Sequence, residues 1–189
     1  ATTEIYTLSL HDALPISDLP FYYVQLSSID RPSWPWFRDS QRRLMDAIPH
    51  TGMAVSSDYG DSLDVHPKNK RPIGERLAHW ALNRTYDKKQ VVPSGPLFRS
   101  VDFREDAAYV GFDYADGLHT ADGRPIREFE IAETEGLYYP AKAEVVGNQV
   151  RVYSDRVKHP CYVRYAWRPF TRANLVNSQS LPASTFRSR

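Results

Sequence analysis

Apolar positions are spaced differently in the two halves of this 189-residue chain. Residues 21–26 and 52–57 are short, largely apolar runs, and each precedes a segment in which apolar residues recur every three or four positions. Such runs are typical of buried parallel strands, and the spacing after them is typical of amphipathic helices. Residues 95–189 instead contain stretches in which apolar and polar residues alternate, a pattern typical of antiparallel sheets.

The first helix is predicted to start at Trp34, with Ser33 as its N-cap, and to end at Pro49. Its apolar residues share helical spacing and are predicted to form the buried face: Trp34, Phe37, Leu44 and Ile48. Gln41 falls on the same face, where a polar group needs a partner. Two interpretations remain open: Gln41 bonds a backbone group near the loop after the second strand, or it is half-exposed at the edge of the stripe.

The second helix is predicted to follow Asn69, which can cap it, with Pro72 in the first turn. Its inward-facing residues are predicted to be Ile73, Leu77, Trp80 and Ala81. Residues 18–90 therefore read as a strand–helix–strand–helix unit, the end of a doubly wound α/β sheet.

Residues 95–189 are predicted to form an all-β, antiparallel, sandwich-like domain, joined through a linker at 87–96. Turn signals recur at residues 116–117, 122–123, 135–136 and 147–148. Cys161 lies in an alternating run and is predicted to be a buried core thiol. The predicted fold class is thus α/β followed by antiparallel β.

Composition excludes several classes of protein. The 24 basic and 23 acidic residues give a formal charge of +1, which argues against a dedicated nucleic-acid binder. A single cysteine excludes an internal disulfide. No apolar stretch approaches the roughly 20 residues of a membrane span.

Chemically reactive side chains are concentrated in residues 58–70 (DYGDSLDVHPKNK), between the second strand and the second helix. The candidates are His66, Ser62, Asp58, Asp61 and Asp64. Strand–helix junctions are where open α/β sheets place ligands and catalytic groups. An acid close to a histidine can orient its imidazole and stabilise the imidazolium.

This loop resembles the histidine-bearing block of the sialate O-acetylesterases, a carbohydrate-esterase branch of the SGNH/GDSL hydrolases, in which an acid-x-His-Pro-x-Asn-Lys segment carries the catalytic base. The resemblance continues in the same order at residues 19–26, 34–41, 74–78, 94–97, 163–167, 174–175 and 181–183. It implies that residues 18–90 are the C-terminal part of an SGNH hydrolase domain and that His66 is the catalytic base.

The resemblance leaves the acid open. Many SGNH enzymes place it three residues before the histidine, where this chain has Leu63. Asp64 is favoured, Asp61 and Asp58 are alternatives, and a dyad without an acid also remains.

The nucleophile is expected to lie outside this chain. Residues 60–63 spell GDSL, but Ser62 lies inside the histidine block, whereas the family's serine block is near the start of its domain. The family's Gly-Gln-Ser-Asn nucleophile block and Gln-Gly-Glu-type oxyanion block do not occur here. Ser62 as nucleophile is the alternative.

No metal site or cofactor is predicted. The histidines of the resembling region are scattered, at His50, His66, His79, His119 and His159, without metal-ligand spacing. Lys68 and Lys70 either attract an anionic group such as a sialic acid carboxylate or are solvated residues at a helix start.

Residues 1–17 lack both the resemblance and the pattern of a signal peptide. They look like translated sequencing-adaptor read-through from a metagenomic assembly, with a divergent natural leader as the alternative. His11 and Asp12 are then without function.

The expected function is removal of O-acetyl groups from sialic acids or related glycans by a serine esterase, of which this chain is an inactive fragment. Its expected partners are an acetylated glycan and the missing N-terminal part of the same enzyme, with no nucleic acid and no membrane span. A periplasmic or extracellular location is expected because glycan substrates occur there. The rivals are a non-catalytic carbohydrate-binding or structural β-sandwich module and a minimal esterase that uses Ser62.

Overall fold

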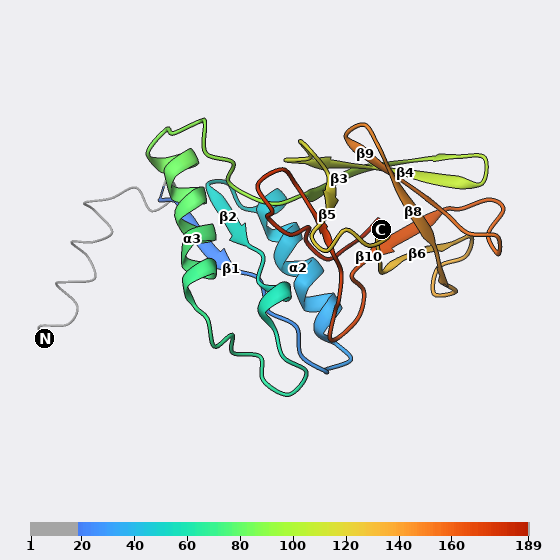
Figure 1. Ribbon diagram of the computed structural model, residues 1–189, viewed down its shortest axis with the longest axis horizontal. Helices are drawn as coiled ribbons and strands as arrows, with labels where there is room; N and C mark the ends of the chain where they lie inside the picture. Colours follow the sequence, from blue (N-terminus) through green and yellow to red (C-terminus); the bar gives the residue numbers. More distant parts are fainter. Residues whose placement is uncertain (1–18, 189) are drawn as a thin grey trace, which may run out of the picture.

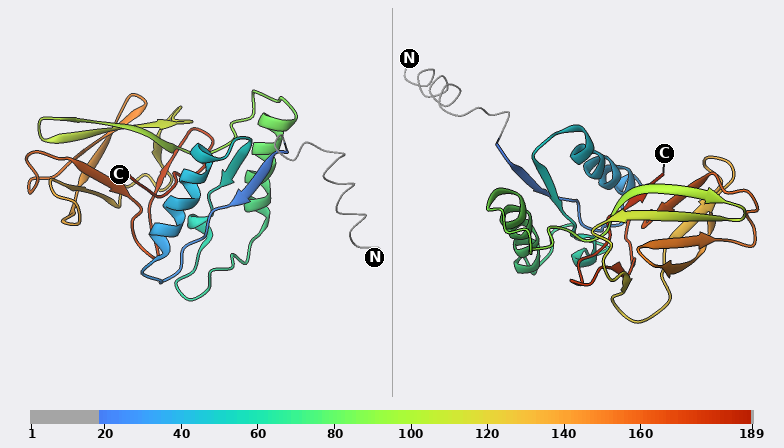
Figure 2. Two further views of the ribbon diagram at one scale, coloured as in Figure 1. Left: turned by 180° about the vertical axis from the view of Figure 1, so that it is seen from behind. Right: turned by 90° about the horizontal axis from the view of Figure 1, so that it is seen from above.

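The computed structural model describes residues 19–188, so the predicted leader at 1–17 lies outside the described residues. Strands β1 (Phe21–Val24) and β2 (Thr51–Ala54) form a two-stranded parallel sheet. Helices α2 (Trp34–Ala47) and α3 (Arg71–Trp80) lie on opposite sides of this pair (Figures 1 and 2). The strand–helix–strand–helix order is confirmed. A doubly wound sheet beyond this one pair stays a prediction.

Two short helical segments flank α3. A 3-10 helix, η2 (Ser57–Tyr59), follows β2, and α3 continues directly into a π-helix, η3 (Ala81–Thr85). The predicted cap of α3 is wrong by one residue, because Lys70 occupies the N-cap position. The Asn69 Oδ1 atom instead accepts a hydrogen bond from the backbone N–H of Arg71 at 3.3 Å.

The rest of the chain is antiparallel sheet, as predicted. One four-stranded sheet has the order β3 (Leu97–Arg104), β4 (Ala107–Asp113), β9 (Gln149–Tyr153) and β8 (Lys142–Val146). A second has the order β12 (Phe186–Arg187), β10 (Tyr162–Tyr165), β6 (Phe129–Ala132) and β7 (Tyr139–Pro140). A small sheet pairs β11 (Leu175–Val176) with β5 (His119–Thr120). This β region lies beyond α2 in Figure 1.

Both four-stranded sheets contribute to one apolar core. Val110 and Val150 enter it from the first sheet, and Val163 and Tyr165 from the second. Phe186 is fully buried and stacks on Phe98, with ring centroids 4.5 Å apart. The alternating side chains of both sheets thus meet in the way that a sandwich requires.

The predicted buried face of α2 is wrong. Phe37, Leu44 and Ile48 are 54%, 42% and 49% exposed, whereas Arg38, Asp39 and Arg42 are buried. The β region packs on this polar side of α2 and supplies partners for it. Arg38, for example, donates hydrogen bonds to the carbonyls of residues 166, 168 and 169. Spacing identifies an apolar stripe, but it cannot say which neighbour covers it.

The inward face of α3 is partly as predicted. Ile73 and Trp80 are buried, while Leu77 and Ala81 are only half-buried. The Trp80 ring lies directly over Gly52 of β2, where an added Cβ atom would be 2.5 Å from the ring. The helix therefore approaches the strand closely only because residue 52 has no side chain.

The prediction for Cys161 is also wrong, because its thiol is exposed. Cys161 precedes β10, and its N–H bonds the carbonyl of Ala132 at 2.8 Å, at the end of the paired region. The alternation of apolar and polar residues extends beyond the part of β10 that faces the core, so the pattern wrongly predicts that Cys161 is buried. Within residues 19–188, no helix combines the length and apolar character needed to cross a membrane.

Candidate active site around His66

The His66 loop leaves the sheet at the carboxyl end of β2. Val24 lies opposite Ala54 in the parallel pair, so both strands end at the same edge. The segment after β1 and the segment of residues 55–70 after β2 therefore lie together at this edge. Open α/β sheets place their ligands there.

Hydrogen bonds between these two segments hold the His66 loop. The Ser27 hydroxyl donates to the carbonyl of Val65, and the Asp30 N–H donates to the carbonyl of Ser62 at 3.1 Å. Gly60 packs so closely on Ser28 that an added Cβ atom would overlap the Ser28 backbone. The loop is thus fixed at three points before it reaches His66.

His66 and Asp64 form a direct pair. Asp64 Oδ1 lies 2.9 Å from His66 Nδ1 and also accepts the His66 backbone N–H at 2.9 Å. These two bonds lower the pKa of Asp64, the backbone bond contributing most, so the carboxyl group is ionised at neutral pH. An ionised carboxylate only accepts hydrogen bonds, so Nδ1 of neutral His66 carries the proton and Nε2 has the free lone pair.

The other two candidate acids have different partners. Asp58 forms a bidentate ion pair with Arg76 of α3, at 2.7 and 2.6 Å. The Asp61 Oδ1 atom accepts the N–H of Leu63 at 2.9 Å, which makes a local turn. Of the three aspartates, Asp64 is the one that the structure places against His66.

Ser62 is exposed and contributes its backbone to the loop. Its carbonyl accepts the bond from Asp30, and in the part of the chain that the structure describes no hydrogen bond joins its hydroxyl to His66. A serine that His66 activates needs such a contact, directly or after substrate binds.

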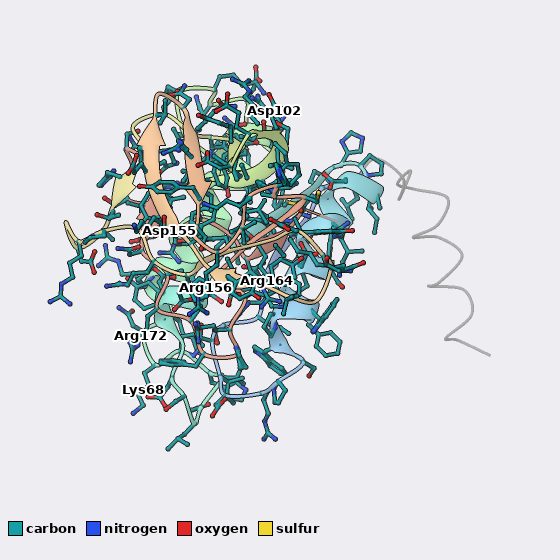
Figure 3. All side chains as sticks on the ribbon, turned by 90° about the vertical axis from the view of Figure 1, so that its right-hand side faces the viewer. Lys68, Asp102, Asp155, Arg156, Arg164 and Arg172 are labelled. Carbon is teal, nitrogen blue, oxygen red and sulfur yellow. The ribbon has the colours of Figure 1, made fainter. Side chains whose placement is uncertain are left out.

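A hollow of about 330 Å³ opens beside His66. It is lined by the ends of both strands and the start of α3, including Gln25, Ser56, His66, Lys70 and Ile73. His66 is 80% exposed and Asp64 51% exposed, so the pair lies at the rim. Lys70 lines the hollow, whereas Lys68 stands at an outer edge of the molecule (Figure 3).

Two glutamines support the edge that carries this hollow. Gln41 accepts the N–H of Leu26 at 2.8 Å and is itself half-buried, so both interpretations hold in part: it bonds a backbone group near the loops, and it is partly exposed. Gln25 is fully buried, and its amide donates to the Arg38 carbonyl and to the Ser184 hydroxyl, both at 2.9 Å. The role of Gln25 was missed because it follows an apolar run and carries no motif.

No group of three or more histidine, cysteine or acidic side chains in residues 19–188 is arranged to hold a metal ion. The polar groups at the hollow fit proton transfer at the His66 Nε2 atom, since its Nδ1 atom is already held by Asp64.

Comparison with known proteins gives an informative similarity to a solved structure. No protein-family model matches this chain, and no curated protein matches it. A crystal structure of a carbohydrate acetylesterase from Xanthomonas citri matches with a TM-score of 0.84 and 38% sequence identity. The match covers 91% of this chain and 41% of the acetylesterase, so this chain spans less than half the length of that protein. The chain is therefore similar to a carbohydrate esterase in both fold and sequence.

Proposed function

We propose that this chain is the C-terminal part of a serine-dependent carbohydrate esterase that removes O-acetyl groups from sialic acids or related glycans. The observation that carries the proposal is the 38% identity to a carbohydrate acetylesterase over nearly the whole chain. The His66–Asp64 pair at the carboxyl edge of β1 and β2 supports it, because ester hydrolysis by serine needs an oriented base.

In this proposal, Nε2 of His66 accepts the proton of a serine hydroxyl as the serine oxygen attacks the acetyl carbonyl. The imidazolium returns the proton to the departing sugar oxygen, which leaves an acetyl-enzyme. Water then attacks the acetyl group with His66 as base again, and acetate leaves. Asp64 holds Nδ1 throughout and stabilises the imidazolium. The serine belongs to a segment outside this chain, and no cofactor takes part.

Exposed apolar surface supports a missing N-terminal partner segment. Within the described residues, β1 pairs only with β2 and so has one open edge. Phe21 on β1 is 63% exposed, and Phe37 and Leu44 of α2 are exposed as well. An open edge beside exposed apolar side chains favours aggregation unless another strand and helix cover it. The proposed periplasmic or extracellular location follows from the glycan substrate.

The deciding test begins with the coding DNA upstream of residue 18. We expect a continuous reading frame that encodes a strand followed by Gly-Gln-Ser-Asn. The extended protein should release acetate from O-acetylated sialic acid or acetylated polysaccharide, and His66→Ala should abolish that release. Ser62→Ala is the matched control in the same loop and should keep it. Acetate release by the present chain that depends on Ser62 would contradict the proposal.

A further inference from the structure

A second and larger hollow lies at the opposite end of the parallel strands. Its volume is about 410 Å³, and it is lined by the starts of β1 and β2, the last turn of α2, the end of α3 and the adjoining ends of β3 and β4. We call it the interface hollow, because the α/β part and the β region meet there. His66 lies at the carboxyl end of β2, whereas Thr51 lines the interface hollow at the amino end of the same strand.

Two tyrosines of the interface hollow are held by consecutive residues of the π-helix η3. Arg84 Nη2 donates to the Tyr114 hydroxyl at 2.9 Å, and the Tyr22 hydroxyl and Thr85 Oγ1 are 2.7 Å apart. π-helical turns are rare in proteins, and those that do occur are often found at functional sites. The result is a pair of aromatic side chains with fixed positions at one opening.

Backbone strain occurs at the same place. Tyr114 has a φ of 58° and His50 a φ of 57°, and both line the interface hollow. Left-handed φ values are costly for residues other than glycine, and such strain is concentrated at functional sites. At Tyr114 the strained conformation is held by Asn177, whose amide donates to the Tyr114 carbonyl at 3.1 Å.

The charged side chains of the interface hollow include both signs, and most of its cations already have carboxylate partners. Arg42 pairs with Asp39 and Asp46, and Lys89 pairs with Asp87. Arg42, Arg84 and Lys89 line it together with Asp46 and Asp113. Asp46 and Asp113 are more than half exposed, and their ion pairs with Arg42 and Arg99 are long, at 3.7 Å, so their carboxylates remain open to solvent. Planar carboxylate and guanidinium groups can bind the hydroxyls of a sugar. Within residues 19–188, the Arg84 guanidinium contacts the Tyr114 hydroxyl and the Trp80 ring and no carboxylate, so it is the group that favours a carboxylate on the ligand.

We infer that the interface hollow is a second carbohydrate-binding site, which takes a pyranose unit that carries a carboxylate. The tyrosine rings contact the apolar face of the sugar ring, the aspartates accept its hydroxyls, and Arg84 pairs with its carboxylate. Binding requires no nucleophile, so the inference stands or fails independently of the proposed esterase activity.

The test is an NMR titration of the whole chain with N-acetylneuraminic acid and D-glucuronic acid, with N-acetylglucosamine and D-glucose as neutral counterparts. We expect at least one acidic sugar to shift the amide of Tyr114 and the indole N–H of Trp80, which also lines the interface hollow. The neutral sugars should bind more weakly. His66→Ala should leave these shifts unchanged.

Arg84→Gln should weaken the binding of the acidic sugar by about tenfold, the loss expected for one charged hydrogen bond. Arg104→Gln is the matched control, because Arg104 is an exposed arginine that also lies over an aromatic ring, that of Tyr109. It pairs with Asp102 and does not line the interface hollow. Circular dichroism melting would verify that both variants fold. No shift with either acid, shifts confined to the His66 hollow, or equal loss in both variants would overturn the inference.

Discussion

Replacing Arg38 by methionine tests how the two parts of the chain are joined. Arg38 is fully buried in α2, and its guanidinium donates to the carbonyls of Ala166 and Pro169 at 3.1 Å and to the carbonyl of Arg168. Burial lowers its pKa to about 10, so the group still carries its charge at neutral pH. Methionine keeps most of the side-chain volume and removes all three bonds.

The magnitude follows from these contacts. A hydrogen bond to a charged group contributes about 1.5–3 kcal/mol, and two of the three bonds are only partly buried, so water can replace part of what is lost. The substitution also removes the Arg38 Nε atom, which is buried without a partner and destabilises the native state. We expect a net loss of about 3 kcal/mol, which lowers the melting temperature by about 6–12 °C in a chain of this size.

The measurement is thermal and urea unfolding followed by circular dichroism. Arg71→Met is the matched control, because Arg71 also lies in a helix and pairs with Glu75 at 2.7 Å, but its side chain is 86% exposed. Its loss should be below about 0.5 kcal/mol. A loss for Arg38→Met no larger than the loss for Arg71→Met would show that these buried bonds do not hold the two parts together.

Three further predictions concern the site and the core. Gly60→Ala should destabilise the protein and displace the His66 loop, because the added methyl group would overlap the Ser28 backbone. Gly74→Ala is the control: position 74 in α3 has open space, so this variant should be neutral or stabilising by up to about 1 kcal/mol, and urea unfolding compares the two. Tyr165→Phe should cost about 1–3 kcal/mol of unfolding free energy, because the buried N–H of Leu175 loses its acceptor at 2.9 Å. Burial raises the pKa of Tyr165, so as the pH rises above about 10 the unfolded chain loses this proton before the folded protein does, and the free energy of unfolding should fall. In Tyr165→Phe the free energy of unfolding should fall less over the same pH range. Asp64→Ala should move the proton of neutral His66 from Nδ1 towards Nε2, and nitrogen chemical shifts of the imidazole that match the unchanged protein would contradict the assigned pair.

Local chemistry could be predicted from the sequence where a short motif contains both partners. Asp64 and His66 are two residues apart, so their contact follows from the loop itself. The strand order β1, β2 and the alternation of β4, β9 and β10 were also predictable, because each depends on nearby positions.

Contacts between distant segments could not be predicted in the same way. The polar residues Arg38 and Asp39 are buried because a segment more than a hundred residues later packs on them. The interface hollow likewise combines Tyr22 with Tyr114, and no periodicity links the two. The SGNH sheet and the serine nucleophile stay proposals, because they would depend on residues that this chain does not contain.

The bond between Gln25 and Ser184 has a consequence for the order of folding. It joins residues 159 positions apart, and the Ser184 N–H also bonds the carbonyl of Pro96 at 3.1 Å. During synthesis, the Gln25 amide at the end of β1 can form this bond only after almost the whole described chain has been made. Contacts between residues far apart in the sequence are slow to form, and until they form the incomplete chain exposes apolar surface. The Gln25 amide therefore has only its Arg38 partner until the end of the chain arrives, and a ribosome pause before residue 184 would leave its second bond unmade.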